Sequence, residues 1–429
     1  MVLMTNFLNQ YQCGNISYNN LSLGLTDICE HMMRKSTSDS IIRILYIHHA
    51  HNLGGAPRSL SAMISHLDKG KYNPIVVIPD RNGNSDVRNL FIDAGAEVVE
   101  EKSLRPFHGS TVAPSSTLND KLYSLCAYPP MVCLAKKLVN RYVPDIVHLN
   151  STCMIAGGVG AKLANPKVPV IAHVREPLLS NRWGRLLAAM NRRTIDHFIS
   201  IDRAGLQSLG SSSISGEVIF NFVDTTVYQS NLTRRASERL TRAWKSRDVV
   251  FLLLSRVAPS NGALEFMRTL AKRRSDIDPR AKFVVAGFET PSSDYMREAL
   301  NVIETSDRYE AVAFTLDVVG LLDAADVLVA PFTTSHSARC IFEGASMGKP
   351  GLITRLPNLQ ELIREGSTGL SYDLADEDEL VSAINRLCDD NTRANFSAEA
   401  VEFGLKEFSA KVNISKIMET YDKLVSSHI

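Results

Sequence analysis

The stretch of sequence that decides the fold is IIRILYIHHAHNLGGAPRSLSAMISHL, residues 41–67. Ile41–Ile47 is a run of mostly β-branched apolar residues, which predicts a buried strand. Ala56–Leu67 has apolar residues at helical spacing, with Pro57 in the first turn, where its missing N–H has no partner to lose. A strand followed directly by a helix is the repeating unit of a parallel sheet that is covered by helices.

The same pairing of an apolar run with an amphipathic segment recurs along the chain. Further strands are expected at 74–79, 96–100, 145–150, 168–174 and 196–201, and then at 249–257, 281–287, 309–315, 325–332 and 349–354. Residues 221–248, between the two series, are polar and have no strand pattern. The sequence therefore predicts an α/β protein with two Rossmann-like parallel-sheet domains that face each other across a cleft, where a ligand would bind.

The composition is typical of a soluble globular protein. The chain has 429 residues, of which 45% are hydrophobic and 22% are charged, and its net charge is +1. This balance argues against broad nucleic-acid binding, so no nucleic-acid partner is expected. The seven cysteines form no CxxC pair, and the N-terminus has no basic segment followed by an apolar run. We therefore expect a cytoplasmic protein with free thiols.

The loop after the first strand, HHAHNLGG at residues 48–55, combines three histidines with two glycines. A metal site is disfavoured, because His48 and His49 are adjacent in an extended segment and should point to opposite faces. Two interpretations stay open for Gly54 and Gly55. They belong either to a loop that lets a phosphate approach backbone N–H groups at a helix N-terminus, or to a tight turn between strand and helix.

The sequence has no dinucleotide fingerprint. The segment GGVGAKLAN, residues 157–165, has glycine at two of the three required positions and Leu163 at the third. A Walker A motif is absent as well, so a nicotinamide enzyme is disfavoured.

Two further strand ends carry charged side chains. HVRE, residues 173–176, places an imidazole, a guanidinium and a carboxylate after an apolar run, with a surface pair of Arg175 and Glu176 as the alternative. Arg256 ends the strand expected at 249–257, and Gly262 begins the next helix. An arginine in that position can bind a phosphate through two parallel hydrogen bonds.

The segment APFTTSHSARCIFEG, residues 330–344, has the same organisation. Small polar residues, Thr333–Ser337, follow a strand, and a helix is expected from Ala338. Glu343 lies in the first turns of that helix, where a carboxylate can accept hydrogen bonds from a sugar or ribose diol. Each of these features taken singly is also compatible with ordinary loop chemistry.

These features belong to an ordered set of motifs. The set comprises GGA (54–56), HVRE (173–176), VIFNFVD (218–224), SRVAPSNG (255–262), LLDAADVLVAPF (321–332), FEGASMGKP (342–350) and NLQELIREGSTGLSYD (358–373). In order and spacing it resembles the retaining glycosyltransferases of the GT-B fold, in particular glycosyltransferase family 4, the glycosyl transferases group 1. The resemblance covers roughly residues 41–427.

The resemblance implies roles for individual residues. Arg256 would bind the diphosphate of a nucleotide sugar, Glu343 would hold the ribose, and His173 would lie near the reacting sugar, so these three are the catalytic candidates. The donor would also contact Gly54, Gly55, Ser335, His336, Ser337, Ala338 and Arg339. The acceptor side would include Gly55, His173, Arg175 and Glu176. No metal and no cofactor would be required, and the donor would be a UDP- or GDP-sugar.

The resemblance also implies domain boundaries. Residues 1–38 would be an extension of unknown role, and residues 39–222 the acceptor-side domain. Residues 223–248 would form a linker, and residues 249–410 the nucleotide-sugar-binding domain. Residues 411–429 would form a helix that crosses back to the first domain.

This chain departs from the family pattern at two positions. Ser335 stands where the family has the first of two glutamates, and Asn261 stands where it has a lysine. Loss of a charged hydrogen bond to phosphate costs about 1.5–3 kcal/mol unless another cation replaces it. Arg339 is a candidate replacement.

The function expected from the resemblance is transfer of a sugar to a hydroxyl acceptor with retention of anomeric configuration, in the synthesis of cell-surface polysaccharide or lipopolysaccharide. The alternatives are a catalytically degenerate subunit of a glycosyltransferase complex, which Ser335 and Asn261 motivate, and a nucleotide-sugar epimerase. The acceptor would be a glycan or a lipid-linked sugar. Asn181–Arg193 is basic and contains Trp183, so it predicts either peripheral contact with the inner face of a membrane or a solvated helix face.

Overall fold

The computed structural model describes residues 41–50, 52–81, 83–111, 117–210, 214–289, 293–315 and 317–428. The extension expected at residues 1–38 lies outside the described residues. By its contacts the chain divides into two compact units, Met1–Ile42 with Asp68–Tyr72, and Arg43–Leu67 with Asn73–Ile429. The described part of the first unit includes a turn in which Gly70 N–H donates to Asp68 Oδ1 at 2.9 Å. The second unit contains every element below except the first residues of β1 and β2.

Seven parallel strands of the described chain form one sheet, in the order β3-β2-β1-β4-β5-β6-β7. They are β1 (Ile42–Ile47), β2 (Tyr72–Pro79), β3 (Glu97–Glu101), β4 (Ile146–Leu149), β5 (Val170–Val174), β6 (His197–Ser200) and β7 (Gly216–Val218). Successive side chains alternate between the two faces of a sheet. Leu45 and Ile47 therefore enter the core on one face, and Tyr46 points to the other.

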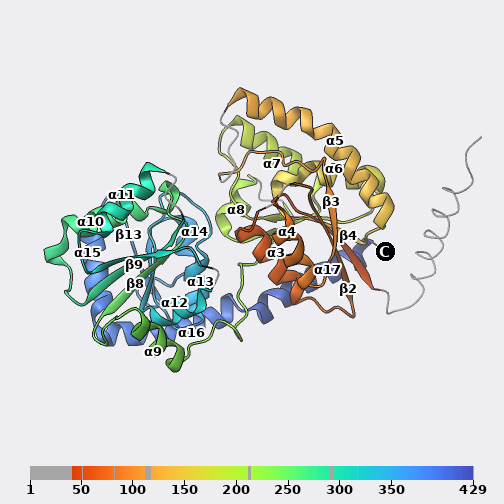
Figure 1. The fold of residues 1–429 in the computed structure, drawn as a ribbon. Helices are drawn as coiled ribbons and strands as arrows, with labels where there is room; N and C mark the ends of the chain where they lie inside the picture. The colour runs from red at the N-terminus through yellow and green to blue at the C-terminus, as the bar shows by residue number, and fades with distance from the viewer. Residues whose placement is uncertain are drawn as a thin grey trace, which may run out of the picture. The chain divides into compact units, whose positions relative to one another are not determined.

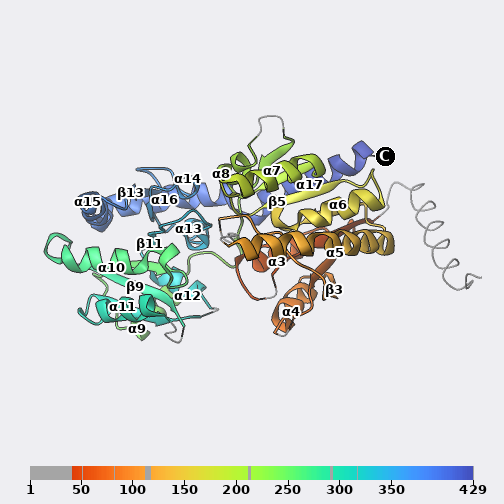
Figure 2. The same cartoon turned by 90° about the horizontal axis from the view of Figure 1, so that it is seen from above.

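Helices cover both faces of this first sheet. They are α3 (Gly55–Ser65), α4 (Ser85–Asp93), α5 (Leu118–Tyr142), α6 (Ile155–Ala164), α7 (Arg182–Thr194), α8 (Arg203–Ser208) and α17 (Ala410–His428). Met131 of α5, Ile155 of α6 and Leu187 of α7 pack into the core with Leu45. On the opposite face, Tyr421 of α17 hydrogen-bonds Tyr46. Figure 1 shows α5, α6 and α7 on one side of the sheet and α3, α4 and α17 on the other, and Figure 2 shows α5 and α6 side by side.

Six more parallel strands form the second sheet, in the order β10-β9-β8-β11-β12-β13. They are β8 (Val249–Leu254), β9 (Ala281–Phe288), β10 (Tyr309–Ala313), β11 (Val327–Ala330), β12 (Gly351–Thr354) and β13 (Gly369–Tyr372). The chain thus contains two separate sheets of parallel strands, each connected by helices. This confirms the predicted GT-B class of fold.

The second sheet is also covered on both faces. Its helices are α9 (Leu232–Thr241), α10 (Ala263–Lys272), α11 (Asp294–Ile303), α12 (Val319–Ala324), α13 (Arg339–Ala345), α14 (Pro357–Gln360), α15 (Glu377–Cys388) and α16 (Asp390–Glu407). Met267 of α10 and Ile384 of α15 pack with Phe251 in one core. Leu322 of α12 and Ile341 of α13 pack on the other face.

The polar segment between the two sheets is not a free linker. Its residues 232–241 form α9, which packs on α12. Arg235 donates to Asp326 Oδ1 at 2.5 Å, and Arg239 donates to Asp326 Oδ2 at 3.1 Å. Arginine side chains thus attach α9 to the second sheet, where the sequence predicts only a polar connection.

Candidate functional site

The residues that the sequence singles out lie at the carboxyl ends of strands. In each sheet the strand order changes direction once, between β1 and β4 in the first sheet and between β8 and β11 in the second. The loops that follow such a pair of strands diverge and leave room for a ligand. Gly54 follows β1, while Arg256 and Ser335 follow β8 and β11.

Gly54 and Gly55 face open space. A Cβ built on either glycine meets no described atom within 4 Å. Gly54, the N-cap of α3, has extended backbone (φ −154°, ψ −167°), and neither glycine has a positive φ. Because neither packing nor backbone conformation requires glycine at these positions, the structure disfavours the tight-turn interpretation.

Arg256 is the exposed cation at the end of β8. Its guanidinium has no hydrogen-bond or ion-pair partner among the residues that the structure describes. An unpaired guanidinium at a strand switch point is available to bind an anion through two N–H groups.

The loops after β8 and β11 are bound to each other. Thr333 N–H donates to Ser260 O at 3.0 Å, and Thr333 Oγ1 donates to Pro259 O at 2.8 Å. Gly262 has a φ of +67°, and a Cβ there would lie 1.9 Å from Pro331 O. Only glycine permits this approach, which positions the loop that carries Arg256.

His336 presents one ring nitrogen from the loop after β11. Its ring stacks on Phe332 with centroids 4.1 Å apart, and its Nδ1 donates to Thr334 O at 2.9 Å. This bond leaves Nε2 of the neutral ring without a proton. Burial lowers the pKa of His336, against the opposing effect of the Thr334 carbonyl. Since Asn358 Nδ2 also donates to His336 O at 2.8 Å, the acceptor Nε2 is held in one orientation.

The neighbours of His336 are placed differently. Ser335 is half-buried, and Ser337 Oγ accepts a hydrogen bond from Asn221 Nδ2 at 3.3 Å. Ala338 is buried and forms the N-cap of α13.

Arg339 and Glu343 form an ion pair on α13. Arg339 Nε and Nη2 donate to Glu343 Oε1 at 3.0 and 2.7 Å, and Arg339 Nη1 donates to Ser59 Oγ on α3 at 3.0 Å. Tyr228 hydrogen-bonds Glu343, and burial together with this carboxylate raises the pKa of Tyr228 to about 12. All three guanidinium nitrogens of Arg339 have partners, so Arg339 is not a free replacement for the lysine missing at Asn261.

A chain of polar contacts runs from Ser337 into the first sheet. Asn221, which donates to Ser337, accepts from Arg175 Nη1 at 3.4 Å. Arg175 Nε and Nη2 both donate to Asn150 Oδ1, at 2.8 and 2.7 Å. Asn150 Nδ2 donates in turn to His48 Nδ1 at 2.7 Å. Arg175 is only 8% exposed, which excludes the alternative of a surface pair with Glu176.

Arg175 and Glu176 have shifted pKa values. Burial lowers the pKa of Arg175 to about 10, with Glu176 opposing the shift and the Arg339 charge adding to it. Burial also raises the pKa of Glu176, against hydrogen bonds from Ser110 and Ser151. The charge of Arg175 therefore interacts with that of Glu176 and, to a smaller extent, with that of Arg339.

His173 lies in a buried layer between the first sheet and α17. It is 4% exposed, and its Nδ1 has no hydrogen-bond partner among the described residues. Its ring lies 5.5 Å from that of His148, whose Nδ1 is 2.8 Å from Tyr421 Oη. Burial and the nearby charge of Arg175 hold the pKa of His173 well below its usual range. The imidazole is therefore neutral at physiological pH.

We expect the free energy of unfolding to fall as the pH falls below the ordinary histidine pKa of about 6.5. Burial lowers the pKa of His48 and His173, and lowers that of His148 to about 3. In this range the unfolded chain binds more protons than the folded one. Each histidine therefore reduces stability by up to about 1.4 kcal/mol per pH unit. Urea unfolding across this range measures the slope, which should decrease in His148→Gln. A pH-independent midpoint would contradict the expectation.

Several residues of this site are missed by the sequence analysis. They are Arg58, Ser59, Asn150, Asn221 and Tyr228. Asn150 directly follows β4, so its place at a strand end was a usable signal. Ser59 and Tyr228 have no such signal, because tertiary folding alone brings them to Arg339 and Glu343. The charge of Arg58 interacts with Tyr228, and its guanidinium has no hydrogen-bond or ion-pair partner among the described residues.

The side chain of Trp183 packs inside its own domain and is not available as a membrane anchor. Its ring stacks on Phe107 with centroids 5.0 Å apart, and its Nε1 donates to His108 O at 2.8 Å. The indole therefore packs α7 against the rest of the domain. This packing speaks against the membrane contact that the sequence suggests for Asn181–Arg193. None of the described helices is long and apolar enough to cross a bilayer.

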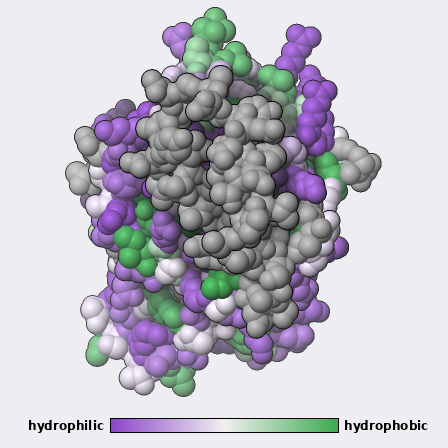
Figure 3. Space-filling view, turned by 90° about the vertical axis from the view of Figure 1, so that its right-hand side faces the viewer, coloured by the Kyte–Doolittle hydropathy of each residue, from purple (hydrophilic) through white to green (hydrophobic). Residues whose placement is uncertain are grey.

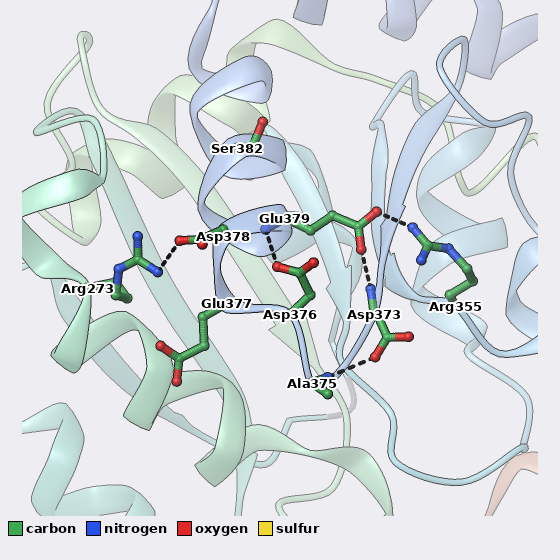
Figure 4. A pocket seen from close by; sticks show the side chains of 9 residues that line it. All are labelled: Arg273, Arg355, Asp373, Ala375, Asp376, Glu377, Asp378, Glu379 and Ser382. Carbon is green, nitrogen blue, oxygen red and sulfur yellow. Dashed lines mark hydrogen bonds and ion pairs between the residues drawn. The ribbon is translucent and has the colours of Figure 1, made fainter.

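A hollow at the start of α15 contains none of the predicted site residues. Figure 4 shows that four of its carboxylates, those of Asp373, Asp376, Asp378 and Glu379, are already engaged, and Glu377 accepts from Lys272 at 3.0 Å. Asp378 accepts from Arg273 at 2.6 Å, Asp376 caps α15 through Glu379 N–H, and Glu379 accepts from Arg355. These contacts stabilise the helix start. The part of the chain that the structure describes also has no cluster of three or more His, Cys, Asp or Glu arranged to hold a metal ion.

Comparison with known proteins supports the resemblance predicted from the motifs. Residues 248–390 match the model of the family Glycosyl transferases group 1. The chain is 22% identical over 340 residues to the UDP-Gal:alpha-D-GlcNAc-diphosphoundecaprenol alpha-1,3-galactosyltransferase of Escherichia coli, covering 76% of this chain and 85% of that protein. It is 21% identical over 388 residues to a GDP-mannose-dependent alpha-mannosyltransferase of Corynebacterium glutamicum, covering 87% of each.

Solved structures share the fold. The crystal structure of Anabaena HepE in complex with UDP matches with a TM-score of 0.72 and 19% identity, over 89% of this chain and all of that one. At this identity the likeness establishes the fold, and the matched length spans both sheets.

Proposed function

We propose, from the premise that residues 248–390 belong to the Glycosyl transferases group 1 family, that this chain transfers a sugar from a nucleotide diphosphate sugar to a hydroxyl acceptor. The observation that carries the proposal is the hydrogen bond from Arg339 to Ser59. It joins the Glu343 ion pair, within the matched region, to the helix that begins at Gly55. One contact thereby connects the two halves of the site that the motifs predict.

The donor is bound by cations and by one carboxylate. Arg256 binds the diphosphate, because its guanidinium is exposed and unpaired. Glu343 accepts hydrogen bonds from the ribose hydroxyls, and Arg339 with Tyr228 holds its carboxylate in place. The unprotonated Nε2 of His336 accepts a hydrogen bond from the donor sugar, where the family has a glutamate at the preceding position, Ser335.

Arg58 replaces the lysine that is absent at Asn261. The Asn261 side chain accepts a hydrogen bond from Ser260 Oγ at 2.7 Å and carries no charge. Arg58, in the first turn of α3, interacts with Tyr228 beside Glu343 and has no ion-pair partner among the described residues. A second guanidinium near the phosphates compensates for the growing charge of the leaving diphosphate.

The reaction proceeds with retention at the anomeric carbon. The bond from C1 to the diphosphate oxygen breaks, a bond from C1 to the acceptor oxygen forms on the same face, and the hydroxyl proton passes to the leaving diphosphate. Arg175 and Glu176, which directly follow β5, face the acceptor, and the neutral ring of His173 lies close enough to feel the charge of Arg175. The relatives act on a diphosphoundecaprenol-linked sugar and with GDP-mannose, which supports a lipid-linked or glycan acceptor and a role in cell-surface glycan synthesis.

Incubation of the protein with UDP- and GDP-sugars and a polyprenyl-diphosphate-linked sugar tests the proposal. We expect one donor to be consumed in step with formation of an elongated acceptor, and NMR coupling constants to show that the anomeric configuration of the donor is kept. Inversion would contradict the mechanism. A changed free nucleotide sugar without acceptor consumption would indicate an epimerase. No turnover by a protein that binds the donor would indicate a degenerate subunit.

The substitution Gly55→Ala should weaken donor binding without lowering the stability of the fold. The Gly55→Ala chain has room for the methyl group and gains helix propensity, so the free energy of unfolding should be unchanged or rise by up to about 1 kcal/mol. The methyl group enters the space proposed for the donor phosphate, so KM should rise roughly tenfold. Gly366→Ala, in a turn with a φ of +73°, is the control and should lose stability with unchanged KM. Unchanged KM in Gly55→Ala would contradict the proposed site.

A further inference from the structure

We propose that Asn221 is a positioning residue that couples the two substrates, so that a bound acceptor tightens the binding of the donor and a bound donor tightens that of the acceptor. The proposal rests on the proposed function, because it concerns the same site. It adds a physical link between the donor loop (residues 335–339) and the acceptor side at Arg175 and Glu176.

The carboxamide of Asn221 contacts both sides of the site. Its Oδ1 accepts a hydrogen bond from Arg175 Nη1 at 3.4 Å, and its Nδ2 donates to Ser337 Oγ at 3.3 Å. An arginine can only donate, so the oxygen of the carboxamide must face Arg175 and its NH2 group must face Ser337. One planar group of fixed orientation therefore connects the residue that follows β5 with the loop that follows β11.

The backbone on either side of Asn221 is held in place. Phe220 O accepts a hydrogen bond from Asn413 Nδ2 at 3.2 Å, and Asn413 is fully buried. Val223 N–H donates to Phe408 O at 2.9 Å. These partners belong to α17 and to the residues just before it. A displacement of the donor loop is therefore passed on through the Asn221 side chain, because the backbone around it is anchored.

The guanidinium of Arg175 depends on Asn221 at one of its edges. Its Nε and Nη2 atoms both donate to Asn150 Oδ1, and the side chain is 8% exposed. Among the described residues, Nη1 donates only to Asn221. Loss of the partner of a buried donor costs free energy. The position of Asn221 therefore decides how this edge of Arg175 is satisfied, and a donor that orders Ser337 also orders Arg175.

The link lies in the interior of the protein. Arg175 is buried, and Asn221 and Ser337 are half-buried. The outer surface differs, since Figure 3 shows mainly hydrophilic side chains in the described part of one face, with hydrophobic side chains in small groups. Partial exclusion of water strengthens hydrogen bonds relative to contacts on such a surface. Two long hydrogen bonds can therefore transmit a measurable effect.

Coupling of this kind is reciprocal. When the donor orders Ser337 and Asn221 passes this order to Arg175, the acceptor binds to residues that are already ordered and loses less conformational entropy. Thermodynamic linkage then requires that the acceptor strengthens donor binding by the same factor. From the usual contribution of a hydrogen bond, we expect a factor of about five.

Calorimetric titration with UDP or GDP, whichever the turnover assay releases, tests the proposal. Each titration is made without and with a saturating concentration of the polyprenyl-diphosphate-linked sugar that the protein elongates. The nucleotide carries no sugar, so no transfer occurs and Kd reports binding alone. We expect the acceptor to lower the Kd of the nucleotide about fivefold in the unmodified chain.

Two substitutions of Asn221 should give opposite results. In Asn221→Ala the acceptor should leave the Kd of the nucleotide unchanged, because both hydrogen bonds are lost. Asn221→Asp should keep the effect of the acceptor, since one carboxylate oxygen accepts from Arg175 and the other accepts from the Ser337 hydroxyl. A purely structural role of Asn221 would not produce this rescue.

Asn385 provides the matched control. It is half-buried like Asn221, and both ends of its carboxamide also join two segments. Its Nδ2 donates to Asp276 O, and its Oδ1 accepts from Asp278 N–H, each at 2.8 Å. Asn385→Ala should unfold at lower urea concentration and keep the effect of the acceptor on Kd. Asn221→Ala should lose that effect with a smaller loss of stability, because its hydrogen bonds are longer.

Ser337→Ala gives a second test that does not depend on the folding of Asn221→Ala. It removes only the hydroxyl that accepts from Asn221, so the effect of the acceptor on Kd should be lost here too. The two substitutions combined should have no additional effect on this coupling.

Three results would overturn the proposal and leave the proposed function intact. They are coupling that persists in both Asn221→Ala and Ser337→Ala, coupling that is lost equally in Asn385→Ala, and absence of coupling in an unmodified chain that transfers sugar. Absence of sugar transfer by the unmodified chain would instead contradict the proposed function, and the coupling proposal would fall with it.

Discussion

Replacement of Arg256 by alanine should lower kcat/KM for the nucleotide sugar by about 100-fold to 1,000-fold. The guanidinium at the end of β8 is exposed and has no partner among the described residues, so its removal breaks no internal contact. The loss is therefore expected to appear in donor binding and turnover, while the free energy of unfolding changes by less than about 0.5 kcal/mol. Steady-state kinetics and urea unfolding measure the two effects.

The Arg256 prediction has two matched comparisons. Arg256→Lys keeps the charge and loses the planar pair of N–H donors, so its activity should lie between those of the alanine variant and the unmodified protein. Arg268→Ala removes an exposed arginine of α10 that pairs with Glu298 at 2.6 Å, and its kinetics should be unchanged. Equal kinetics for Arg256→Ala and Arg268→Ala would show that Arg256 does not meet the diphosphate.

Replacement of Glu343 should have the second large effect. Glu343→Gln keeps the shape of the side chain and loses its charge, so KM for the donor should rise about tenfold. Glu343→Ala removes the acceptor altogether and leaves Arg339 without its carboxylate, so KM should rise about 100-fold or more. The alanine variant should also unfold at lower urea concentration, since Arg339 is partly buried.

A nucleotide series identifies the contact that Glu343 makes. The KM penalty of Glu343→Gln should disappear with a donor whose ribose lacks its hydroxyls, because that donor has no hydrogen bond to lose. Glu399→Gln, at an exposed residue of α16, serves as the control. An undiminished penalty with the modified ribose would mean that Glu343 acts only by holding Arg339.

The fold could be predicted because its strands are apolar and its connections are short. Runs such as 74–79 and 281–287 alternate with amphipathic helices, and the strands predicted from this pattern are present. The edge strands β7 (Gly216–Val218) and β13 (Gly369–Tyr372) are not predicted, because they are short and each includes a glycine. Helix α9 is not predicted either, since its stability comes from arginine contacts to Asp326 and not from an apolar stripe.

The site residues that directly follow a strand were predictable from the sequence. The residues that reach the site through contacts between distant parts of the chain were not. Arg256, Gly54 and the Ser335–Arg339 loop each lie directly after a strand, which is a property of local sequence. The polar chain through Asn221, Arg175 and Asn150 joins residues more than twenty positions apart. The burial of His173 was not predictable from HVRE, because it depends on the packing of α17.

Nucleotide-sugar binding at Arg256 and Glu343 is tested most directly by a thermal-shift titration of the purified chain with UDP, GDP, ADP and their sugar conjugates, in the presence of EDTA. If Arg256 and Glu343 bind a nucleotide sugar, Tm should rise with one nucleotide series. The rise should survive EDTA, be lost in Arg256→Ala and Glu343→Ala, and persist in Arg268→Ala. No shift with any nucleotide, or a shift that is the same in Arg256→Ala as in the unmodified chain, would contradict the proposal that these residues bind a nucleotide sugar.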